Sequence, residues 1–177
     1  MEDHLKAAIR GVRDFPKKGI VFRDITPVLA DAALLREAVD RLSEPFYDQR
    51  VEYVAGTEAR GFILAPAVAI QLAAGFVPIR KKGKLPCATF EASYELEYGT
   101  DSLEMHRDAI RAGARVLMVD DLLATGGTMR ACCDMVEAAG GTVVACAFLV
   151  ELSFLGGRAK LAPHNVFSLV NYAGEEE

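Results

Sequence analysis

The sequence is poor in residues that build metal centres and disulfide frameworks. Its three histidines lie far apart, which argues against a histidine-based metal cluster or catalytic triad. Its four cysteines show no CxxC spacing and have no neighbouring histidine; they are Cys87, Cys132, Cys133 and Cys146. We therefore expect free thiols in a reducing compartment rather than disulfides or a zinc site.

Long apolar runs are also missing. The longest nearly apolar stretch, 61–74, is too short to cross a bilayer. The first 19 residues carry charges throughout and contain no apolar segment of the kind that a secretory signal needs. These absences predict no membrane association and a cytoplasmic location.

An excess of positive charge is absent as well. The chain has 20 Lys and Arg against 25 Asp and Glu, so its net charge is −5. This balance argues against binding nucleic acid, although it leaves room for a local site for a small anion. At 177 residues, of which 51% are hydrophobic, the chain is long enough for one domain with a substantial core.

What the sequence does contain is an alternation of strand and helix patterns. Asp31 can cap a helix that Pro45 ends, and an earlier helix is expected over 5–12. The other expected helices are 62–74, which stops at Gly75, and 128–139, and the expected strands are 51–55, 76–79, 116–119 and 142–152. Strands that alternate with helices predict an α/β fold with a mostly parallel sheet.

Residues 92–105 interrupt this alternation. Apolar and acidic side chains alternate on either side of a turn near 99–101, which predicts a two-stranded ribbon that projects from the sheet. Its polar, glycine-containing tip is compatible with a mobile flap over a site or with a solvated hairpin that has no role.

The strongest functional feature is the segment VLMVDDLLATGGT at 116–128. A buried strand ends in two carboxylates, and a turn rich in glycine and threonine then enters a helix. Glycines allow an anion close to the backbone, and the helix N-terminus supplies unpaired N–H groups, so this turn is predicted to bind phosphate. It is neither a Walker A loop nor a GxGxxG turn.

Asp120 and Asp121 distinguish this loop from a generic phosphate site. Carboxylates beside a phosphate-binding turn suit a sugar phosphate, because they accept hydrogen bonds from sugar hydroxyls. The alternative is that the two aspartates serve only as caps or salt-bridge partners.

At this loop the sequence resembles the phosphoribosyl pyrophosphate (PRPP) signature of the type I phosphoribosyltransferases. Five further segments resemble the adenine phosphoribosyltransferases in that family's order: FRDITPVL at 22–29, GTEARGF at 56–62, IRKKGKLP at 79–86, ASYELEYG at 92–99 and VELSFLGGRAKLAP at 150–163. The resemblance implies a single domain over 1–177 with the type I phosphoribosyltransferase fold. In it, helices flank a central sheet, about 1–30 form a base-binding hood, and the ribbon is a flexible flap.

The resemblance also implies an activity. The family transfers the 5-phosphoribosyl group from PRPP to adenine, which gives AMP and pyrophosphate in purine salvage. Mg²⁺ is the expected cofactor, held mainly through PRPP or pyrophosphate oxygens and water and not directly by the protein, and a homodimer is expected. The alternatives are a phosphoribosyltransferase for hypoxanthine, guanine or xanthine, and a PRPP-sensing regulator.

Site residues follow from the same resemblance. The 5′-phosphate is expected at Ala124, Thr125, Gly126, Gly127 and Thr128. Asp120 and Asp121 are expected to meet the ribose hydroxyls and to stabilise positive charge at the anomeric carbon. Glu97 is the expected general acid/base near adenine, and Tyr98 is expected to close over the reacting centre.

Pyrophosphate and adenine complete the implied site. The pyrophosphate-binding positions are Glu58, Ala59, Arg60, Arg80, Lys81 and Lys84. Here a non-proline cis peptide is expected near Glu58 and Ala59, and Ala59 stands where the family usually has Ser. Loss of that hydroxyl removes a contact to pyrophosphate but leaves the backbone N–H groups. The adenine-binding positions are Val21, Phe22, Arg23 and Leu152.

Overall fold

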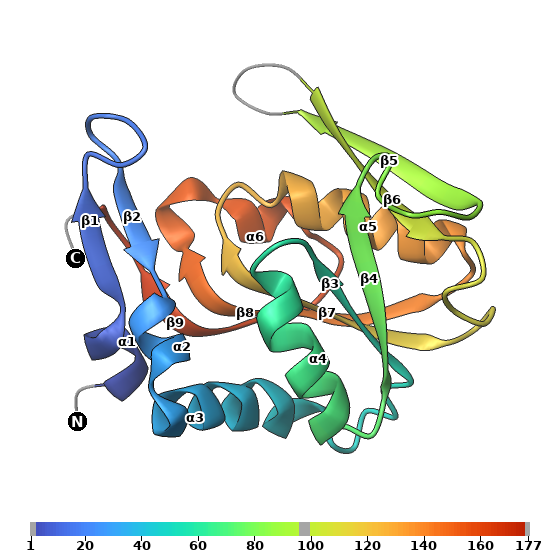
Figure 1. Cartoon of the computed structure of the whole chain (residues 1–177), viewed down its shortest axis with the longest axis horizontal. Coiled ribbons are helices and arrows are strands. Elements are labelled where there is room, and N and C mark those ends of the chain that lie inside the picture. Colours follow the sequence, from blue (N-terminus) through green and yellow to red (C-terminus); the bar gives the residue numbers. More distant parts are fainter. Residues whose placement is uncertain (1–2, 96–99, 176–177) are drawn as a thin grey trace.

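The computed structural model describes residues 3–95 and 100–175, which form an α/β fold around a seven-stranded sheet (Figure 1). The strand order is β5-β6-β4-β3-β7-β8-β9. Its strands are β3 (Tyr53–Thr57), β4 (Gly75–Lys81), β5 (Thr89–Glu95), β6 (Thr100–His106), β7 (Arg115–Leu123), β8 (Thr142–Leu152) and β9 (Val166–Tyr172). The neighbouring strands β4, β3, β7, β8 and β9 pair in parallel. Strand β6 pairs antiparallel with both β4 and β5. The predicted mostly parallel sheet is therefore confirmed.

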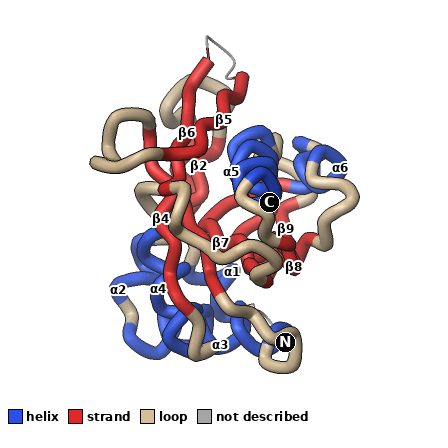
Figure 2. The backbone as a smooth tube through the Cα atoms, turned by 90° about the vertical axis from the view of Figure 1, so that its right-hand side faces the viewer, coloured by secondary structure: helices blue, strands red, loops and turns tan. Residues whose placement is uncertain are grey.

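Helices cover both faces of the sheet (Figure 2). The helices on one face are α1 (His4–Ala8), α2 (Thr26–Ala30), α3 (Ala32–Ser43) and α4 (Gly61–Gln71), and those on the other are α5 (Gly127–Ala138) and α6 (Gly157–Lys160). Short 3-10 turns lie at Glu44–Phe46 and Ser153–Leu155, and a small antiparallel pair is formed by β1 (Arg10–Arg13) and β2 (Val21–Asp24). None of the helices in the described part of the chain is both long and apolar enough to cross a membrane.

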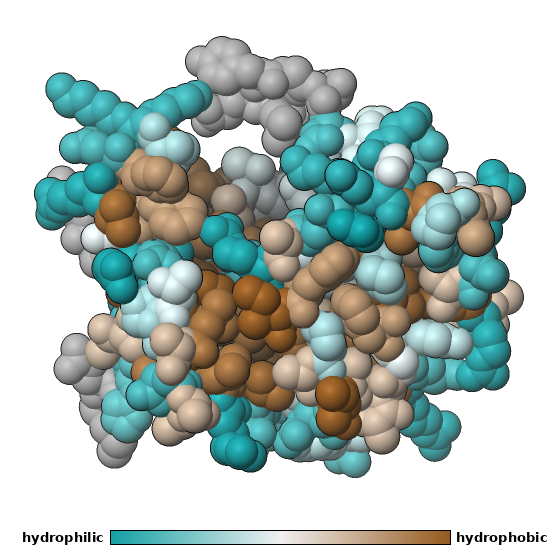
Figure 3. All heavy atoms as spheres, in the orientation of Figure 1, coloured by the Kyte–Doolittle hydropathy of each residue, from teal (hydrophilic) through white to brown (hydrophobic). Residues whose placement is uncertain are grey.

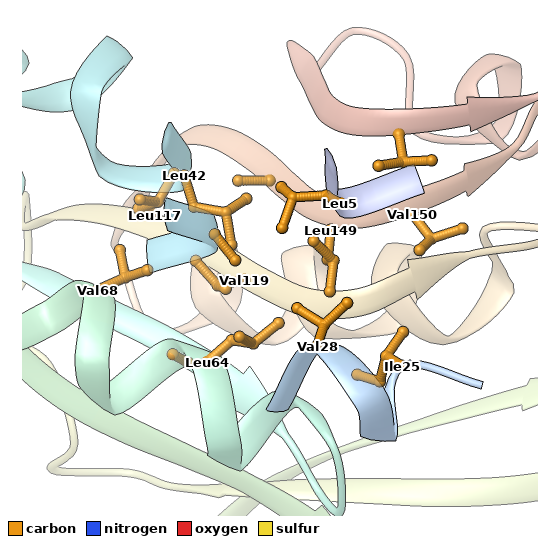
Figure 4. Close-up of a cluster of buried hydrophobic side chains, with 14 of the residues drawn as sticks. Leu5, Ile25, Val28, Leu42, Leu64, Val68, Leu117, Val119, Leu149 and Val150 are labelled. Carbon is orange, nitrogen blue, oxygen red and sulfur yellow. The ribbon is translucent and has the colours of Figure 1, made fainter. Parts of the chain in front are cut away.

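The central strand β7 shows how two cores arise from one apolar run. Leu117 and Val119 pack with Leu42, Leu64 and other side chains of the α1–α4 layer (Figure 4). Val116 and Met118 point to the opposite face and pack in the α5 layer. Successive side chains of a strand alternate between faces, so a strand covered on both sides must be apolar at nearly every position.

Several local predictions are confirmed. The Asp31 carboxylate caps α3 by accepting from the backbone N–H groups of Ala33 and Leu34 at 2.8 and 3.1 Å. Strand β8 has the predicted bounds. All four cysteines are free thiols; Cys132 and Cys133 of α5 and Cys146 of β8 are buried in the same core.

Several boundaries differ from the prediction; β3, expected over 51–55, is Tyr53–Thr57. The first helix ends at Ala8, and Arg10–Arg13 instead form β1 because they pair with β2. Gly75 does not stop α4: the helix ends at Gln71, Ala73 takes the left-handed conformation (φ 53°), and Gly75 begins β4. Strand β7 continues through both aspartates to Leu123, because it stays paired with β8.

The predicted ribbon is present as β5 and β6, which pair from Thr89 with His106 to Glu95 with Thr100. Its second strand starts at Thr100, within the turn predicted near 99–101. The tip, 96–99, lies outside the described residues.

Candidate active site

A cavity of about 400 Å³ opens where β3 and β7 end and α5 begins. It is lined by 57–60, Tyr94, 120–129 and Phe148. This is the carboxyl edge of the parallel strands, where open α/β sheets bind their ligands. The volume suits a small molecule. The structure therefore brings together the predicted phosphate-binding residues, both aspartates and 58–60.

The phosphate-binding turn enters α5 through Gly126, which has the left-handed conformation (φ 80°). The first backbone N–H groups of a helix have no partner within it and carry partial positive charge, so the twelve-residue helix α5 presents donors to this cavity. The turn is backed by Gly157 at the start of α6. A Cβ at Gly157 would lie 2.2 Å from the carbonyl oxygen of Ala124, so only glycine permits this approach.

Asp120 is held in place by two donors. The Thr57 hydroxyl donates to its Oδ2 at 2.5 Å, and the backbone N–H of Asp121 donates to its Oδ1 at 2.9 Å. Burial, followed by the neighbouring charge of Asp121, raises the pKa of Asp120 to about 7. Its ionisation is therefore sensitive to a cation or hydroxyl that enters the cavity.

Asp121 faces a different partner. The Nε of Arg60 lies 2.5 Å from its Oδ2, and the Asp121 side chain is only 9% exposed. The guanidinium of Arg60 also lies over the ring of Phe22, 5.2 Å from its centroid. Arg60 thus links Asp121 to Phe22 of β2, one of the predicted adenine-binding residues.

The segment between β3 and α4 contains the predicted cis peptide, between Glu58 and Ala59. The Glu58 carboxylate accepts from the backbone N–H of Lys81 at 2.8 Å and from Nε of Arg80 at 3.2 Å. The Nζ of Lys81 lies 3.2 Å from Asp101, and this contact raises the pKa of Lys81. The basic run that begins at Arg80 is therefore attached to the 58–60 turn, but its members do not line the cavity themselves.

Three of the predicted adenine-binding residues belong to β2, and none of the four lines the cavity. Phe22 faces Arg60, whereas Val21 and Arg23 line a second hollow with Tyr172. The Arg23 guanidinium stacks on Tyr172 at 3.8 Å and donates to the carbonyl of Glu175 at 2.8 Å. Leu152 ends β8. The structure brings Phe22 close to the aspartates through Arg60 and keeps the Arg23 side chain away from them.

Two predicted residues, Glu97 and Tyr98, lie outside the described residues. Thr57 and Tyr94 are the polar cavity residues that the sequence reasoning missed. The apolar ones are Leu122, Leu123, Met129 and Phe148. Thr57 gives no local signal, because its partner Asp120 is 63 positions away. Tyr94 belongs to the alternating pattern of the ribbon, which places it on one face of β5. The pattern does not show which part of the protein that face contacts.

The side chains around the cavity bear on the expected Mg²⁺. Within 3–95 and 100–175 no group of three or more His, Cys, Asp or Glu side chains could hold a metal ion. Asp120 and Asp121 are engaged by Thr57 and Arg60, and hard cations such as Mg²⁺ take oxygen ligands and retain water. The site fits an ion that arrives with its phosphate ligand better than one that resides in a protein cage.

Replacing Asp120 by Asn is expected to stabilise the unliganded chain, and more so at pH 8 than at pH 5. The folded-state pKa of Asp120 lies above its ordinary value, so wild-type stability falls as the pH rises from about 4 to about 7. Asn does not titrate. Its amide oxygen can accept from the Asp121 N–H, and its NH2 group can donate to the Thr57 hydroxyl oxygen, which reverses that hydrogen bond. The advantage of the variant should grow by roughly 2–3 kcal/mol between pH 5 and pH 8. Thermal unfolding at both pH values measures it.

Asp24→Asn is the matched control for this experiment. Hydrogen bonds from Thr26 lower the pKa of Asp24, so its loss should be neutral or destabilising above pH 4. A constant difference between wild type and Asp120→Asn at all pH values would show that the Asp120 carboxyl is not desolvated.

The family model described as phosphoribosyl transferase domain matches 27–170, which assigns this α/β chain to the phosphoribosyltransferase class. The adenine phosphoribosyltransferase of Geotalea daltonii is 55% identical over 170 residues, which covers 96% of this chain and 99% of that protein. The chain belongs to the adenine phosphoribosyltransferase family, with the type I phosphoribosyltransferase fold.

Solved structures agree. The adenine phosphoribosyltransferase of Rhodothermus marinus is 56% identical, with a TM-score of 0.90 over 95% of this chain and 96% of that one. The Saccharomyces cerevisiae enzyme is 41% identical, with a TM-score of 0.88 over 93% and 95%, and was solved with an imino-altritol bisphosphate and adenine. The fold predicted from the family resemblance is thus confirmed.

Proposed function

We propose that this chain transfers the 5-phosphoribosyl group of PRPP to adenine, releasing AMP and pyrophosphate in purine salvage. The observation that carries the proposal is the single cavity that joins the phosphate-binding turn at 124–128 to Asp120 and Asp121. The adenine in the S. cerevisiae structure supports the choice of base. The bond between C1 of ribose and the pyrophosphate oxygen breaks, and a bond to a ring nitrogen of adenine forms.

The 5-phosphate binds at the turn, where the N-terminus of α5 and the hydroxyls of Thr125 and Thr128 provide donors. Anchored there, the ribose places its hydroxyls toward Asp120 and Asp121. Positive charge develops at C1 as pyrophosphate departs, and fixed carboxylates stabilise it more than they stabilise the ground state.

Arg60 changes partner during this sequence. In the free chain it is paired with Asp121. PRPP brings pyrophosphate oxygens and ribose hydroxyls to the same place, so Arg60 can bind pyrophosphate while Asp121 receives the hydroxyls. Glu58 and the backbone at Ala59 form the floor of this subsite, and Arg80, Lys81 and Lys84 supply further positive charge when the basic segment approaches.

Adenine lies between Phe22 and Leu152, with Val21 and Arg23 contributing through the backbone. The Arg23 side chain is engaged with Tyr172, which favours a backbone role. Glu97 exchanges a proton with the base, and Tyr98 closes over the centre and excludes water.

Mg²⁺, when bound with PRPP, neutralises charge on the departing pyrophosphate. The chain contributes its carboxylates near the ribose hydroxyls and leaves most of the coordination to substrate oxygens and water.

A homodimer and a cytoplasmic location complete the proposal. Helix α4 is apolar nearly all round, and the side that does not face the core exposes Ile63 at 44% and Ile70 at 82%. Apolar atoms gather around this helix in the face shown in Figure 3. An apolar helix surface of this kind favours association with a second copy.

Formation of AMP from adenine and PRPP with Mg²⁺ tests the proposal. We expect adenine to be converted at least about 100-fold more efficiently than guanine or hypoxanthine, because a site that pairs the 6-amino group leaves polar groups unpaired with a 6-oxo purine. Release of pyrophosphate in equal amount is the second readout. Preferred use of guanine or hypoxanthine would assign the other purine specificity, and PRPP binding without turnover on any purine would favour a regulator.

A further inference from the structure

Tyr94 is the one aromatic residue of the ribbon that lines the cavity in the described part of the chain. It lies on β5, and its side chain is half-buried against the start of α5. The proposed mechanism gives it no task. Tyr94 and the phosphate-binding turn line the same cavity, so a ligand bound at the turn would lie near the Tyr94 side chain.

The hydroxyl of Tyr94 hydrogen-bonds a carboxylate. It donates to Oδ2 of Asp101 at 3.3 Å, which is long for such a bond, and Tyr94 lines the cavity together with Thr128. Asp101 is in turn paired with Nζ of Lys81 at 3.2 Å. Thr128 belongs to the predicted phosphate-binding turn, so the ribbon and that turn border the same cavity.

The protonation of this group suits a donor. Burial, and then the charge of Asp101, raises the pKa of Tyr94 above its usual value, so the phenol remains protonated over the neutral range. A phosphate dianion at Thr128 would be a stronger acceptor than the distant carboxylate. Lys81 partly neutralises Asp101, which reduces repulsion between that carboxylate and the phosphate.

We propose that the Tyr94 hydroxyl binds the ribose 5-phosphate, adding a donor from the ribbon to those of the turn. This inference rests on the proposed function. In the free chain the hydroxyl donates to Asp101, and with ligand present it donates to a phosphate oxygen. Tyr94 therefore contributes to binding of the ribose phosphate and not to that of pyrophosphate.

Calorimetric titration of wild type and Tyr94→Phe with ribose 5-phosphate, and separately with pyrophosphate and Mg²⁺, tests the inference. Loss of a hydrogen bond to a charged group should weaken ribose 5-phosphate binding about 10-fold. Pyrophosphate affinity should be unchanged, and the KM for PRPP should rise with kcat within about 2-fold of wild type. The control is Tyr47→Phe, which removes an exposed hydroxyl that Gln71 contacts and should change neither affinity.

The outcomes separate the two proposals. Equal ribose 5-phosphate affinities in wild type and Tyr94→Phe would overturn the role of Tyr94, and so would an equal loss for both ligands, since that result indicates a displaced ribbon. Thermal unfolding of the variant confirms that it is folded. A wild-type chain that neither binds ribose 5-phosphate nor converts adenine would overturn the proposed function itself.

Discussion

Asp121→Asn is expected to lower kcat by about 10²- to 10³-fold, because it removes a fixed negative charge near the carbon that becomes cationic. The affinity for PRPP should change by less than about 5-fold, since an amide oxygen still accepts from a ribose hydroxyl. Asp121 is nearly buried and its carboxylate faces the cavity beside Asp120. Its charge therefore lies in a poorly solvated environment, where its attraction for the cationic carbon is stronger than in water.

Single-turnover kinetics and a direct titration with PRPP separate the two effects. Asp134→Asn, which removes an exposed carboxylate that pairs with Arg130 on α5, is the control and should leave both quantities unchanged. If Asp121→Asn lowered kcat and PRPP affinity by the same factor, Asp121 would be a ground-state binding residue and the charge-stabilisation argument would fail.

Gly157→Ala is expected to raise the KM for PRPP by at least about 10-fold, because the new methyl group must displace the phosphate-binding turn. A Cβ at this position would lie 2.2 Å from the carbonyl oxygen of Ala124 and 3.0 Å from the Leu123 side chain. The closest neighbour is backbone, so the collision cannot be relieved by a rotamer change. The turn has to move away from α6, which misaligns its donors.

Gly156→Ala provides a matched control one residue away. Gly156 has φ 69°, but a Cβ there meets nothing within 4 Å. Its substitution should cost about 1 kcal/mol in stability from backbone strain and leave the KM for PRPP near that of wild type. A similar rise in KM for both variants would show that the effect arises from general destabilisation and not from displacement of the turn.

Much of the fold could be predicted from the sequence, where local patterns and burial agree. The apolar run of β8 indicates a strand covered on both faces, because such a strand must be apolar throughout. The glycine-rich turn before α5 likewise indicates a helix start. The Asp31 cap is equally local, since its carboxylate bonds N–H groups two and three residues on.

The predictions that were wrong concern segments whose structure depends on residues far away in the sequence. Arg10–Arg13 continue a helical pattern, but pairing with Val21–Asp24 makes them a strand. Gly75 has the residue type of a helix stop, yet its place in β4 is set by close packing, since a Cβ there would lie 3.0 Å from the ring of Tyr53. Local propensity is overridden where a long-range contact is stronger.

The candidate site shows the same division. Asp120, Asp121 and the phosphate-binding turn are contiguous and could be found from the sequence. Thr57 and Tyr94 join them only because the sheet brings β3 and β5 to the same cavity. The residue pattern around Thr57 or Tyr94 alone does not show that either side chain reaches this cavity.

The most direct test of the central claim is a crystal structure of this chain with AMP. The account predicts that the phosphate accepts hydrogen bonds from backbone N–H groups of 125–128, with the ribose hydroxyls at Asp120 and Asp121. A nucleotide bound elsewhere, with the turn at 124–128 making no contact to phosphate, would contradict it.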